Sequence, residues 1–204
     1  GVCFATSGPG ATNLITALAD AMMDSVPLLA ITGQVPTAAI GSDAFQEIDV
    51  LGMSLSCTKH SYMVERAEDL AEILQEAIHL AQSGRPGPVL VDIPKDIQMA
   101  QVPFKPWLAA DEYLPELDLK QVAIANQLLS EAKQPVAYVG GGVQAADAQD
   151  ELMQFLNKTQ MPAVSTLKAL GSVLPDYEHY LGMLGMHGGQ AANIAVQECD
   201  VLVC

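Results

Sequence analysis

Short, uninterrupted apolar runs alternate with helical patterns along this chain, and this alternation constrains the fold more than any other feature. The apolar runs are residues 2–5, 27–32, 89–93, 135–139, 162–165 and 200–204, and residues 57–64 are a further expected short strand of mixed polarity. Apolar residues with helical spacing lie between them, at 11–24, 65–83, 119–132, 148–157 and 188–197. Continuous apolar strands separated by amphipathic helices are typical of a parallel sheet covered on both faces. The pattern predicts an α/β protein with three layers.

One segment, residues 98–118, breaks this rhythm and predicts a boundary. It contains Pro103, Pro106 and Pro115 and has no apolar periodicity, which is typical of a linker between domains. We therefore expect two α/β units, residues 1–97 and 119–204. The first residues already form an apolar run and the last ones form another, so we expect both units to be incomplete pieces of a longer protein.

The charge and the cysteines exclude several classes of protein. The net charge is −15 with only two arginines, which argues against nucleic-acid binding by phosphate neutralisation. The most apolar window, residues 14–32, contains Asp20, Asp24 and Pro27, so we expect no membrane span. The cysteines form no C-x-x-C pair, and we predict reduced, mostly buried thiols of an intracellular protein: Cys3, Cys57, Cys199 and Cys204.

The long polar loop at residues 33–49 is a candidate site. It follows a buried strand, and such loops carry the chemistry of many α/β proteins. Its carboxylates, Asp43, Glu47 and Asp49, are candidates for acid–base groups, metal ligands or solvated loop residues, and their spacing matches no calcium loop. The histidines show no zinc-binding spacing either.

Glycine-rich turns follow several of the expected strands. Residues 6–10, TSGPG, connect an expected strand to an expected helix. Such a turn either binds an anion at the helix N-terminus or is a simple tight turn. It lacks the lysine of a P-loop. In the second unit, residues 140–142 and 166–167 follow expected strands, and residues 180–187 are expected to form a glycine-rich loop. Together, residues 140–142, 166–167 and 184–189 suggest a nucleotide-type ligand at the carboxyl ends of the strands, and three ordinary turns are an equal alternative. Arg85 and Lys95 flank one expected strand. They are candidates for binding an anionic ligand, and the alternative is that they neutralise neighbouring carboxylates.

Whole phrases of the sequence go further than these patterns. The chain closely resembles the large, catalytic subunit of acetolactate synthase (acetohydroxyacid synthase), and most closely the bacterial enzymes. The phrases that carry the resemblance occur in order over almost the whole chain: ATSGPGATNLITALADAMMDSVPLLAITGQVP, IGSDAFQEIDV, CTKHSYMV, SGRPGPVLVDIPKDIQ, YVGGGV, STLKALGS and LGMLGMHGGQAAN.

The resemblance implies a thiamine diphosphate enzyme, a transferase of a two-carbon unit. It would condense two pyruvates to 2-acetolactate, or pyruvate with 2-oxobutyrate, with release of CO2, in valine, leucine and isoleucine biosynthesis. It implies FAD with a largely structural role and Mg²⁺ that holds the diphosphate. It also implies a cytoplasmic homodimer or higher oligomer with its active site between subunits, and a possible regulatory small subunit.

The resemblance also implies roles for individual residues. Gln46 matches the glutamine beside thiamine diphosphate, and Asp43, Glu47 and Asp49 are left with loop-shaping roles. The substrate channel is matched by Pro36, Ala44, Phe45, Lys59 and Lys95. FAD contacts are matched by Ser25 and Arg85 in the first unit and by Gly141, Thr166, Leu167, Leu184, Gly185, Met186 and His187 in the second.

The same resemblance implies what this chain lacks. The family's catalytic glutamate precedes the first residue, and the segment that binds Mg²⁺ belongs to a third domain. We therefore expect residues 1–204 to span the later part of the pyrimidine-binding domain and the first part of the central FAD-binding domain, with no activity alone. The alternatives are another thiamine diphosphate enzyme, such as a pyruvate oxidase or glyoxylate carboligase, or a non-catalytic nucleotide-binding module.

Overall fold

The computed structural model describes residues 1–104, 106 and 116–204. The chain divides into two compact units, Gly1–Tyr113 and Leu114–Cys204. Ten of the 21 residues of the expected linker, residue 105 and residues 107–115, lie outside the described residues. Its first two residues, Gln98 and Met99, belong to a short helix, α4 (Lys95–Met99), at the end of unit 1.

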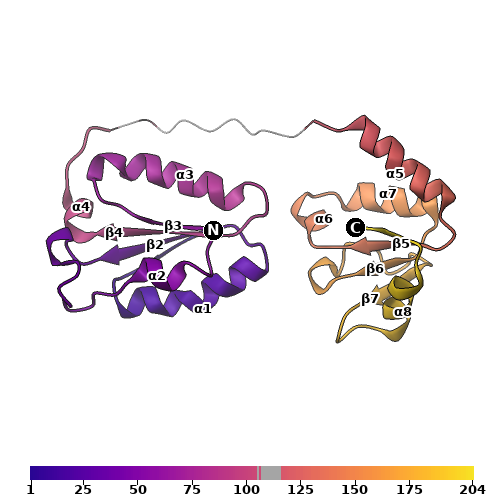
Figure 1. The fold of residues 1–204 in the computed structure, drawn as a ribbon, viewed down its shortest axis with the longest axis horizontal. Helices are drawn as coiled ribbons and strands as arrows, with labels where there is room; N and C mark the ends of the chain where they lie inside the picture. Colours follow the sequence, from indigo (N-terminus) through magenta and orange to yellow (C-terminus); the bar gives the residue numbers. More distant parts are fainter. Residues whose placement is uncertain (105, 107–115) are drawn as a thin grey trace. The chain divides into compact units, whose positions relative to one another are not determined.

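Unit 1 is built on a four-stranded parallel sheet. The strand order is β1 (Val2–Ala5), β2 (Leu28–Gln34), β4 (Pro88–Pro94) and β3 (His60–Met63). Helices α1 (Pro9–Met23) and α2 (Val50–Ser54) cover one face of this sheet, and α3 (Leu70–Gln82) covers the other (Figure 1). Two 3₁₀ turns, Thr37–Ala39 and Ala67–Asp69, complete the unit. The expected covered parallel sheet is confirmed.

Alternation along the buried strand β4 divides the core of unit 1 into two clusters. Val89 and Val91 pack with Val64 and Ala77 on the α3 face. Leu90 packs on the opposite face with Leu18, Ala30 and Val50, which come from α1, β2 and α2. A fully buried aliphatic side chain of this size contributes roughly 1.5–3 kcal/mol. Every residue of β4 is buried, so this strand fixes the sheet from which the loops leave.

Unit 2 has its own four-stranded parallel sheet. The strand order is β7 (Tyr180–Met183), β6 (Ala163–Ser165), β5 (Pro135–Val139) and β8 (Val201–Val203). Helix α7 (Gln149–Thr159) packs on one face and α8 (Gln190–Glu198) on the other (Figure 1). The remaining helical segments are α5 (Leu119–Glu131), α6 (Gly142–Ala145) and a 3₁₀ turn at Leu167–Ala169.

Strand β7 corrects the sequence-based expectation of a glycine-rich loop over residues 180–187. The first four of these residues form a strand parallel to β6, and its register shifts between the partners of Ala163 and Ser165. Gly182 has a φ of 86° within the strand. A glycine inside a strand is typical of such an irregular pairing. Because of its glycines, the sequence pattern did not reveal this short, irregularly paired strand.

The cysteines also differ in part from expectation. All four are free thiols, but only Cys57 is buried, while Cys3 and Cys199 are half-buried and Cys204 is exposed.

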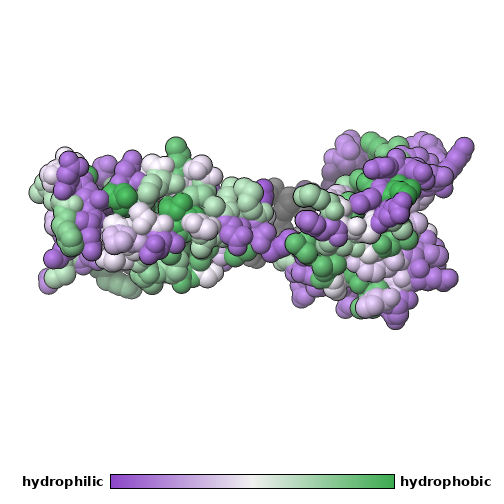
Figure 2. Space-filling model, turned by 90° about the horizontal axis from the view of Figure 1, so that it is seen from below, coloured by the Kyte–Doolittle hydropathy of each residue, from purple (hydrophilic) through white to green (hydrophobic). Residues whose placement is uncertain are grey.

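Apolar side chains lie among polar ones on the face shown in Figure 2. Within the described part of the chain, no helix is long and apolar enough to cross a membrane.

Candidate functional site

The carboxyl ends of β1, β2 and β4 lie at one edge of the sheet in unit 1, because these strands are parallel neighbours. Three connections leave from this edge. The turn at residues 6–10 follows β1, the loop at residues 35–49 follows β2, and Lys95 directly follows β4. Ligands of α/β proteins bind outside the carboxyl ends of such strands, so this edge is the candidate active-site edge.

The turn and the loop meet where Gly8 faces Gln46. Gly8 has a φ of 61°, and a Cβ atom built on it would lie 2.8 Å from the carbonyl oxygen of Gln46. Gln46 itself has a φ of 63°, an uncommon conformation for a residue with a side chain. Only a glycine fits at position 8, both for its backbone angle and for this contact. The backbone of Gln46 is thus held against the turn.

Two carboxylates of the loop itself accept hydrogen bonds from backbone N–H groups and so determine its conformation. The Glu47 carboxylate accepts hydrogen bonds from the backbone N–H groups of Gly41 and Ala44, the latter at 2.9 Å. These bonds, from Gly41 first, lower the pKa of Glu47. The Asp49 carboxylate accepts a bond from the Gly52 N–H at 2.8 Å and caps α2. The loop-shaping role implied for Glu47 and Asp49 agrees with these contacts.

A further carboxylate reaches this loop from α4. The Asp96 carboxylate accepts hydrogen bonds from the backbone N–H of Thr37, at 2.9 Å, and from the Thr37 hydroxyl. These bonds, from the hydroxyl first, lower the pKa of Asp96. The loop is therefore attached to the structure that follows β4 as well as to its own strand.

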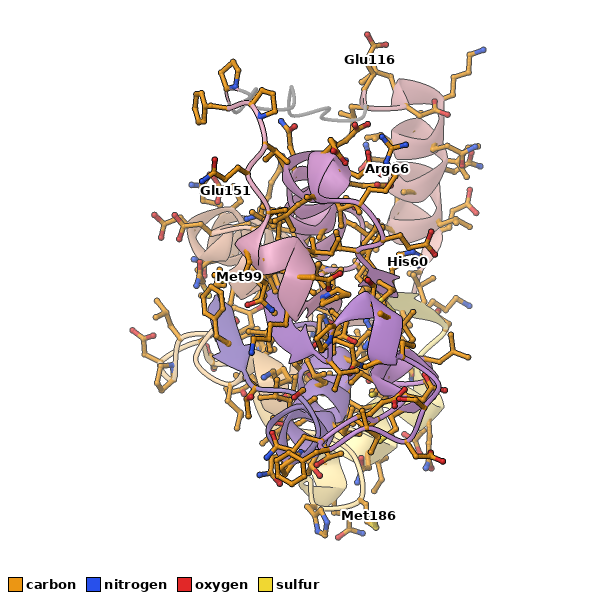
Figure 3. The ribbon with its side chains drawn as sticks, turned by 90° about the vertical axis from the view of Figure 1, so that its left-hand side faces the viewer. His60, Arg66, Met99, Glu116, Glu151 and Met186 are labelled. Atoms are coloured by element: carbon orange, nitrogen blue, oxygen red, sulfur yellow. The ribbon has the colours of Figure 1, made fainter. Side chains whose placement is uncertain are left out.

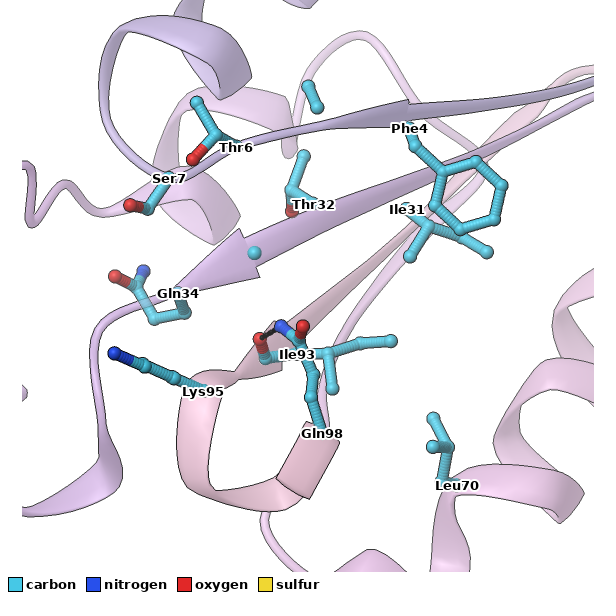
Figure 4. A pocket seen from close by; sticks show the side chains of 12 residues that line it. Phe4, Thr6, Ser7, Ile31, Thr32, Gln34, Leu70, Ile93, Lys95 and Gln98 are labelled. Atoms are coloured by element: carbon cyan, nitrogen blue, oxygen red, sulfur yellow. Dashed lines mark hydrogen bonds between the residues drawn. The ribbon is translucent and has the colours of Figure 1, made fainter. Parts of the chain in front are cut away.

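A hollow of about 500 Å³ opens beside the turn. Figure 4 shows Thr6, Ser7, Gln34 and Lys95 at one end of it and Phe4, Ile31 and Leu70 at the other. Gln98 lines its wall and donates to the Ile93 carbonyl oxygen at 2.6 Å. The hollow thus combines one cation and several hydroxyl and amide groups with an apolar end.

Four of the five residues expected in a substrate channel belong to this edge of unit 1. Pro36, Ala44 and Phe45 lie on the loop, Lys95 lines the hollow, and the Phe45 side chain is 89% exposed. Lys59 is separated from them, because it precedes β3 and lies at the amino edge of the sheet. Its ammonium donates to the carbonyl oxygens of Leu80 and Ser83, the latter at 2.6 Å, and burial lowers its pKa.

Ser25 and Arg85, the FAD contacts expected in the first unit, are brought together at the amino edge. Arg85 Nε donates to Ser25 Oγ at 2.8 Å, and Arg85 Nη2 donates to the carbonyl oxygens of Met22 and Met23 at 3.0 and 2.9 Å. The guanidinium therefore binds carbonyl groups at the end of α1 that lack helical partners.

Arg85 and Lys95, the two cations that flank one strand, do not lie close enough to bind one anion together. Arg85 precedes β4 and Lys95 follows it, so the two cations lie at opposite edges of the sheet. A strand of seven residues is roughly 23 Å long at 3.3 Å per residue, which is too far for one phosphate or carboxylate.

The three glycine-rich turns of unit 2 do lie side by side. They follow β5, β6 and β7, which are adjacent in the sheet. The Thr166 N–H donates to the Val139 carbonyl oxygen at 2.9 Å, and the Leu184 N–H donates to that of Ser165 at 3.1 Å. A Cβ atom on Gly141 would lie 3.0 Å from Lys168 Cβ, so the first two turns pack closely.

Asn193 holds the third turn, and sequence reasoning missed it. Its Oδ1 accepts from the Gly185 N–H at 2.8 Å and its Nδ2 donates to the Gly185 carbonyl oxygen at 3.0 Å. The phrase GGQAAN places this asparagine on α8, but no spacing rule links a helix residue to a turn eight positions earlier. The turn leaves His187 exposed and Met186 93% exposed, projecting from its tip (Figure 3).

No metal centre is evident in the part of the chain that the structure describes. Within those residues, no group of three or more His, Cys, Asp and Glu side chains is placed to hold a metal ion.

Two family matches agree with the two units. Residues 1–53 match the family "Thiamine pyrophosphate enzyme, N-terminal TPP binding domain". Residues 122–204 match the family "Thiamine pyrophosphate enzyme, central domain". The two α/β units are therefore similar, in this order, to the N-terminal and central domains of thiamine pyrophosphate enzymes.

Relatives along the whole chain narrow this class. The chain is 60% identical to the acetolactate synthase isozyme 2 large subunit of Escherichia coli, covering 100% of this chain and 37% of that protein. It is 51% identical to the acetolactate synthase large subunit of Corynebacterium glutamicum and 50% identical to the chloroplastic acetolactate synthase 3 of Brassica napus, covering 100% of this chain and 33% and 32% of those proteins. The chain is thus homologous along its whole length to acetolactate synthase large subunits, and it spans about a third of the length of these relatives.

Proposed function

We propose that this chain forms part of an acetolactate synthase. The reaction is the decarboxylation of pyruvate and the transfer of its two-carbon unit to a second 2-oxo acid, pyruvate or 2-oxobutyrate, in branched-chain amino-acid synthesis. The observation that carries the proposal is the meeting of Gly8 and Gln46 at the carboxyl edge of unit 1, in a chain homologous throughout to acetolactate synthases.

The residues of this edge fit thiamine diphosphate. A close backbone contact fixes Gln46 beside the turn at residues 6–10. The side chains of Glu47 and Asp49 are held by hydrogen bonds to backbone N–H groups. The Gln46 side chain has no such bond among the described residues. An amide group with a fixed backbone and free hydrogen-bonding atoms suits recognition of a heterocycle. When bound, thiamine diphosphate supplies the carbon nucleophile and the electron sink that decarboxylation of a 2-oxo acid requires.

The chain's own residues would guide the substrate. Lys95 is the cation of the hollow, and its ammonium attracts the carboxylate of a 2-oxo acid. Pro36, Ala44 and Phe45 form an apolar surface on the neighbouring loop, and such a surface excludes water when it is covered. These residues bind and orient, and none of them is proposed to transfer a proton.

The turns of unit 2 fit a flavin. A Cβ atom on Gly140, Gly142 or Gly185 would meet no atom within 4 Å, so the turns leave room above the sheet edge. The Leu167 and Met186 side chains are 68% and 93% exposed there, and exposed apolar side chains beside bare backbone suit a planar ring system. We assign FAD to these turns, with Gly141, Thr166, Leu167, Leu184, Gly185, Met186 and His187 as its contacts.

Ser25 and Arg85 are the proposed FAD contacts of unit 1. Arg85 uses Nε and Nη2 for its three hydrogen bonds, and within the described residues its Nη1 group has none. Two N–H donors on a guanidinium held in place by other contacts suit a phosphate or a ring edge. Mg²⁺ belongs to the proposal as the ion that binds the diphosphate, with no ligand assigned among the residues of this chain.

The proposal also includes partners. Two of the relatives are named as large subunits, and on this ground we propose a homodimer or higher oligomer that accepts a regulatory small subunit. Its small-molecule partners are 2-oxo acids.

A segment exchange tests the proposal. The homologous segment of the Escherichia coli isozyme 2 large subunit is replaced by residues 1–204, and the chimaera is purified with thiamine diphosphate, Mg²⁺ and FAD. Production of 2-acetolactate from pyruvate, and of 2-aceto-2-hydroxybutyrate when 2-oxobutyrate is added, is expected. A folded chimaera with bound cofactors that forms only acetyl phosphate, or consumes glyoxylate instead, would assign the chain to the pyruvate oxidases or the glyoxylate carboligases.

A further inference from the structure

A buried polar cluster lies beneath the candidate active-site edge. Thr32 and Gln34 of β2 and Asp92 of β4 are on the same face of the sheet, and Thr32 is directly paired with Asp92. The Thr32 hydroxyl donates to Asp92 Oδ1 at 2.6 Å, and Gln34 Nε2 donates to Asp92 Oδ2 at 2.9 Å. Asp92 and Thr32 have no exposed surface, and Gln34 is 5% exposed.

The side-chain amide of Gln34 can take only one orientation in this cluster. Its Nε2 group also donates to the carbonyl oxygen of Ile48 at 3.0 Å, while its Oε1 accepts from the N–H of Val35 at 2.8 Å. An ionised carboxylate and a carbonyl group only accept hydrogen bonds, and a backbone N–H only donates. A rotated amide would lose all three bonds, so Asp92 acts together with Ile48 and Val35 to determine which atom of Gln34 faces the loop.

This orientation matters because Ile48 lies two residues after Gln46. The bond from Gln34 holds the loop at Ile48, and the contact with Gly8 holds it at Gln46 itself. A continuous series of contacts thus runs from Asp92 through Gln34 to the loop segment that carries Gln46.

We infer that Asp92 is a positioning residue, which acts through Gln34 to hold Gln46 in the place where it meets thiamine diphosphate. The part of this inference that concerns the cofactor rests on the proposed function. The part that concerns the loop does not.

The cost of burying this carboxylate supports the inference. Burial raises the pKa of the Asp92 carboxyl to about 6, and the hydrogen bonds from Thr32 and then Gln34 oppose the rise. A buried charged group contributes little net stability compared with apolar residues of similar volume. Asp92 stands in a strand whose other residues are apolar. Its role is therefore to orient the side-chain amide of Gln34, and not to stabilise the core.

Hydrogen exchange of the 204-residue chain tests the loop part directly. Asp92→Leu removes both carboxylate oxygens, so Gln34 Nε2 and the Thr32 hydroxyl lose their shared partner, and Gln34→Leu removes the connection itself. Both variants should accelerate exchange of the amides in residues 41–50 at least tenfold, relative to those of α3 on the other face of the sheet. Unchanged relative exchange in both variants would overturn the inference.

Ser61→Ala is the matched control. Ser61 lies on β3, next to Leu90, and its hydroxyl bonds to those of Ser54 and Thr58 at 2.7 and 3.0 Å. This variant also loses partly buried hydrogen bonds on the same sheet, but Ser61 makes no hydrogen bond to the loop. It should lower the melting temperature and leave the relative exchange of residues 41–50 unchanged.

The active chimaera tests the cofactor part. Asp92→Leu and Gln34→Leu should each raise the KM for thiamine diphosphate at least tenfold. Because the two residues act in series, the KM of the double variant should not exceed the higher KM of the two single variants. Independent effects that multiply in the double variant, or an unchanged KM despite faster loop exchange, would overturn it. An inactive unmutated chimaera would instead count against the proposed function, and hydrogen exchange would still decide the loop part.

Discussion

The backbone of Gln46 lies so close to Gly8 that a single added carbon atom on Gly8 would stand 2.8 Å from the Gln46 carbonyl oxygen. This contact joins a turn after β1 to a loop after β2. Both residues also have a positive φ, 61° and 63°. Two unusual backbone conformations in direct contact indicate that the relative position of the turn and the loop is tightly determined.

Gly8→Ala should therefore harm both stability and cofactor binding. The left-handed backbone costs about 1–2 kcal/mol for a residue with a side chain, and the clash with Gln46 must be relieved by moving the loop. We expect a loss of at least about 2 kcal/mol in urea unfolding of the chain. In the chimaera, we expect a KM for thiamine diphosphate raised at least tenfold.

Gly84→Ala separates backbone strain from the clash. Gly84 has a similar φ of 55°, but a Cβ atom there would meet no atom within 4 Å. It should cost only about 1–2 kcal/mol for the left-handed backbone and leave the KM for thiamine diphosphate unchanged. Equal effects of the two substitutions on this KM would show that the contact between Gly8 and Gln46 is not what matters.

Much of the fold followed from the sequence because apolar runs and helical periodicity are local properties. The strand at Pro135–Val139 was predicted with its bounds, and the helix at Leu119–Glu131 to within one residue. Strand β7 was missed because Gly182 interrupts its apolar pattern. Short helices such as α2 and α4, of five residues each, carry too few positions to show a period.

The candidate site was predictable in part, and mainly through resemblance. Spacing alone singled out the carboxylates of the loop, and the structure shows Glu47 and Asp49 bound to backbone N–H groups. The buried contacts of Gln34 with Asp92 join residues 58 positions apart. A pairing of this kind depends on which strands are neighbours, and periodicity does not reveal strand order.

Arg85→Ala should destabilise unit 1 as well as reduce flavin retention. Its three hydrogen bonds tie Ser25 and the end of α1 to the segment before β4. A typical hydrogen bond contributes about 0.5–1.5 kcal/mol to stability. Because these three bonds are exposed to solvent, the free energy of unfolding should fall by only roughly 1–2 kcal/mol. Thermal unfolding of the 204-residue chain measures this loss without any cofactor.

Ser25→Ala is the control for the arginine. It removes only the Nε bond, so about 0.5–1 kcal/mol should be lost, and both carbonyl bonds of Arg85 remain. The flavin content of the purified chimaera then tests the FAD assignment. A chimaera with Arg85→Ala that keeps full flavin content would show that Arg85 only supports α1.

Lys95 and Lys59 should behave differently when each is changed to Met, which keeps the length of the side chain and removes the charge. Lys95 lines the hollow at the candidate active-site edge, and its loss should raise the KM for pyruvate about tenfold with little change in melting temperature. Lys59 binds carbonyl oxygens at the end of α3, and its loss should lower the melting temperature. A raised KM for pyruvate without destabilisation in Lys59→Met would support its place in the channel instead.

Asp92 should make the stability of the chain depend on pH between about 4 and 6. Its folded-state pKa of about 6 lies above the ordinary value of 3.8, so the folded state binds the proton more tightly. The contribution of this group is thus fully present below pH 4 and is lost as the pH rises through 6. At about 1.4 kcal/mol per pH unit for one proton, the loss is no more than about 3 kcal/mol.

The comparison with Asp92→Asn isolates this effect, because every other titratable group is the same in both proteins. Glu47, Asp96 and Asp200 have lowered pKa values, so their contributions are lost only as the pH falls below the ordinary carboxyl range. The difference in unfolding free energy, wild type minus Asp92→Asn, should therefore decrease from pH 4 to pH 7. A difference that stays constant, or increases with pH, would mean that Asp92 is ionised throughout and that its hydrogen bonds fully offset the cost of burial.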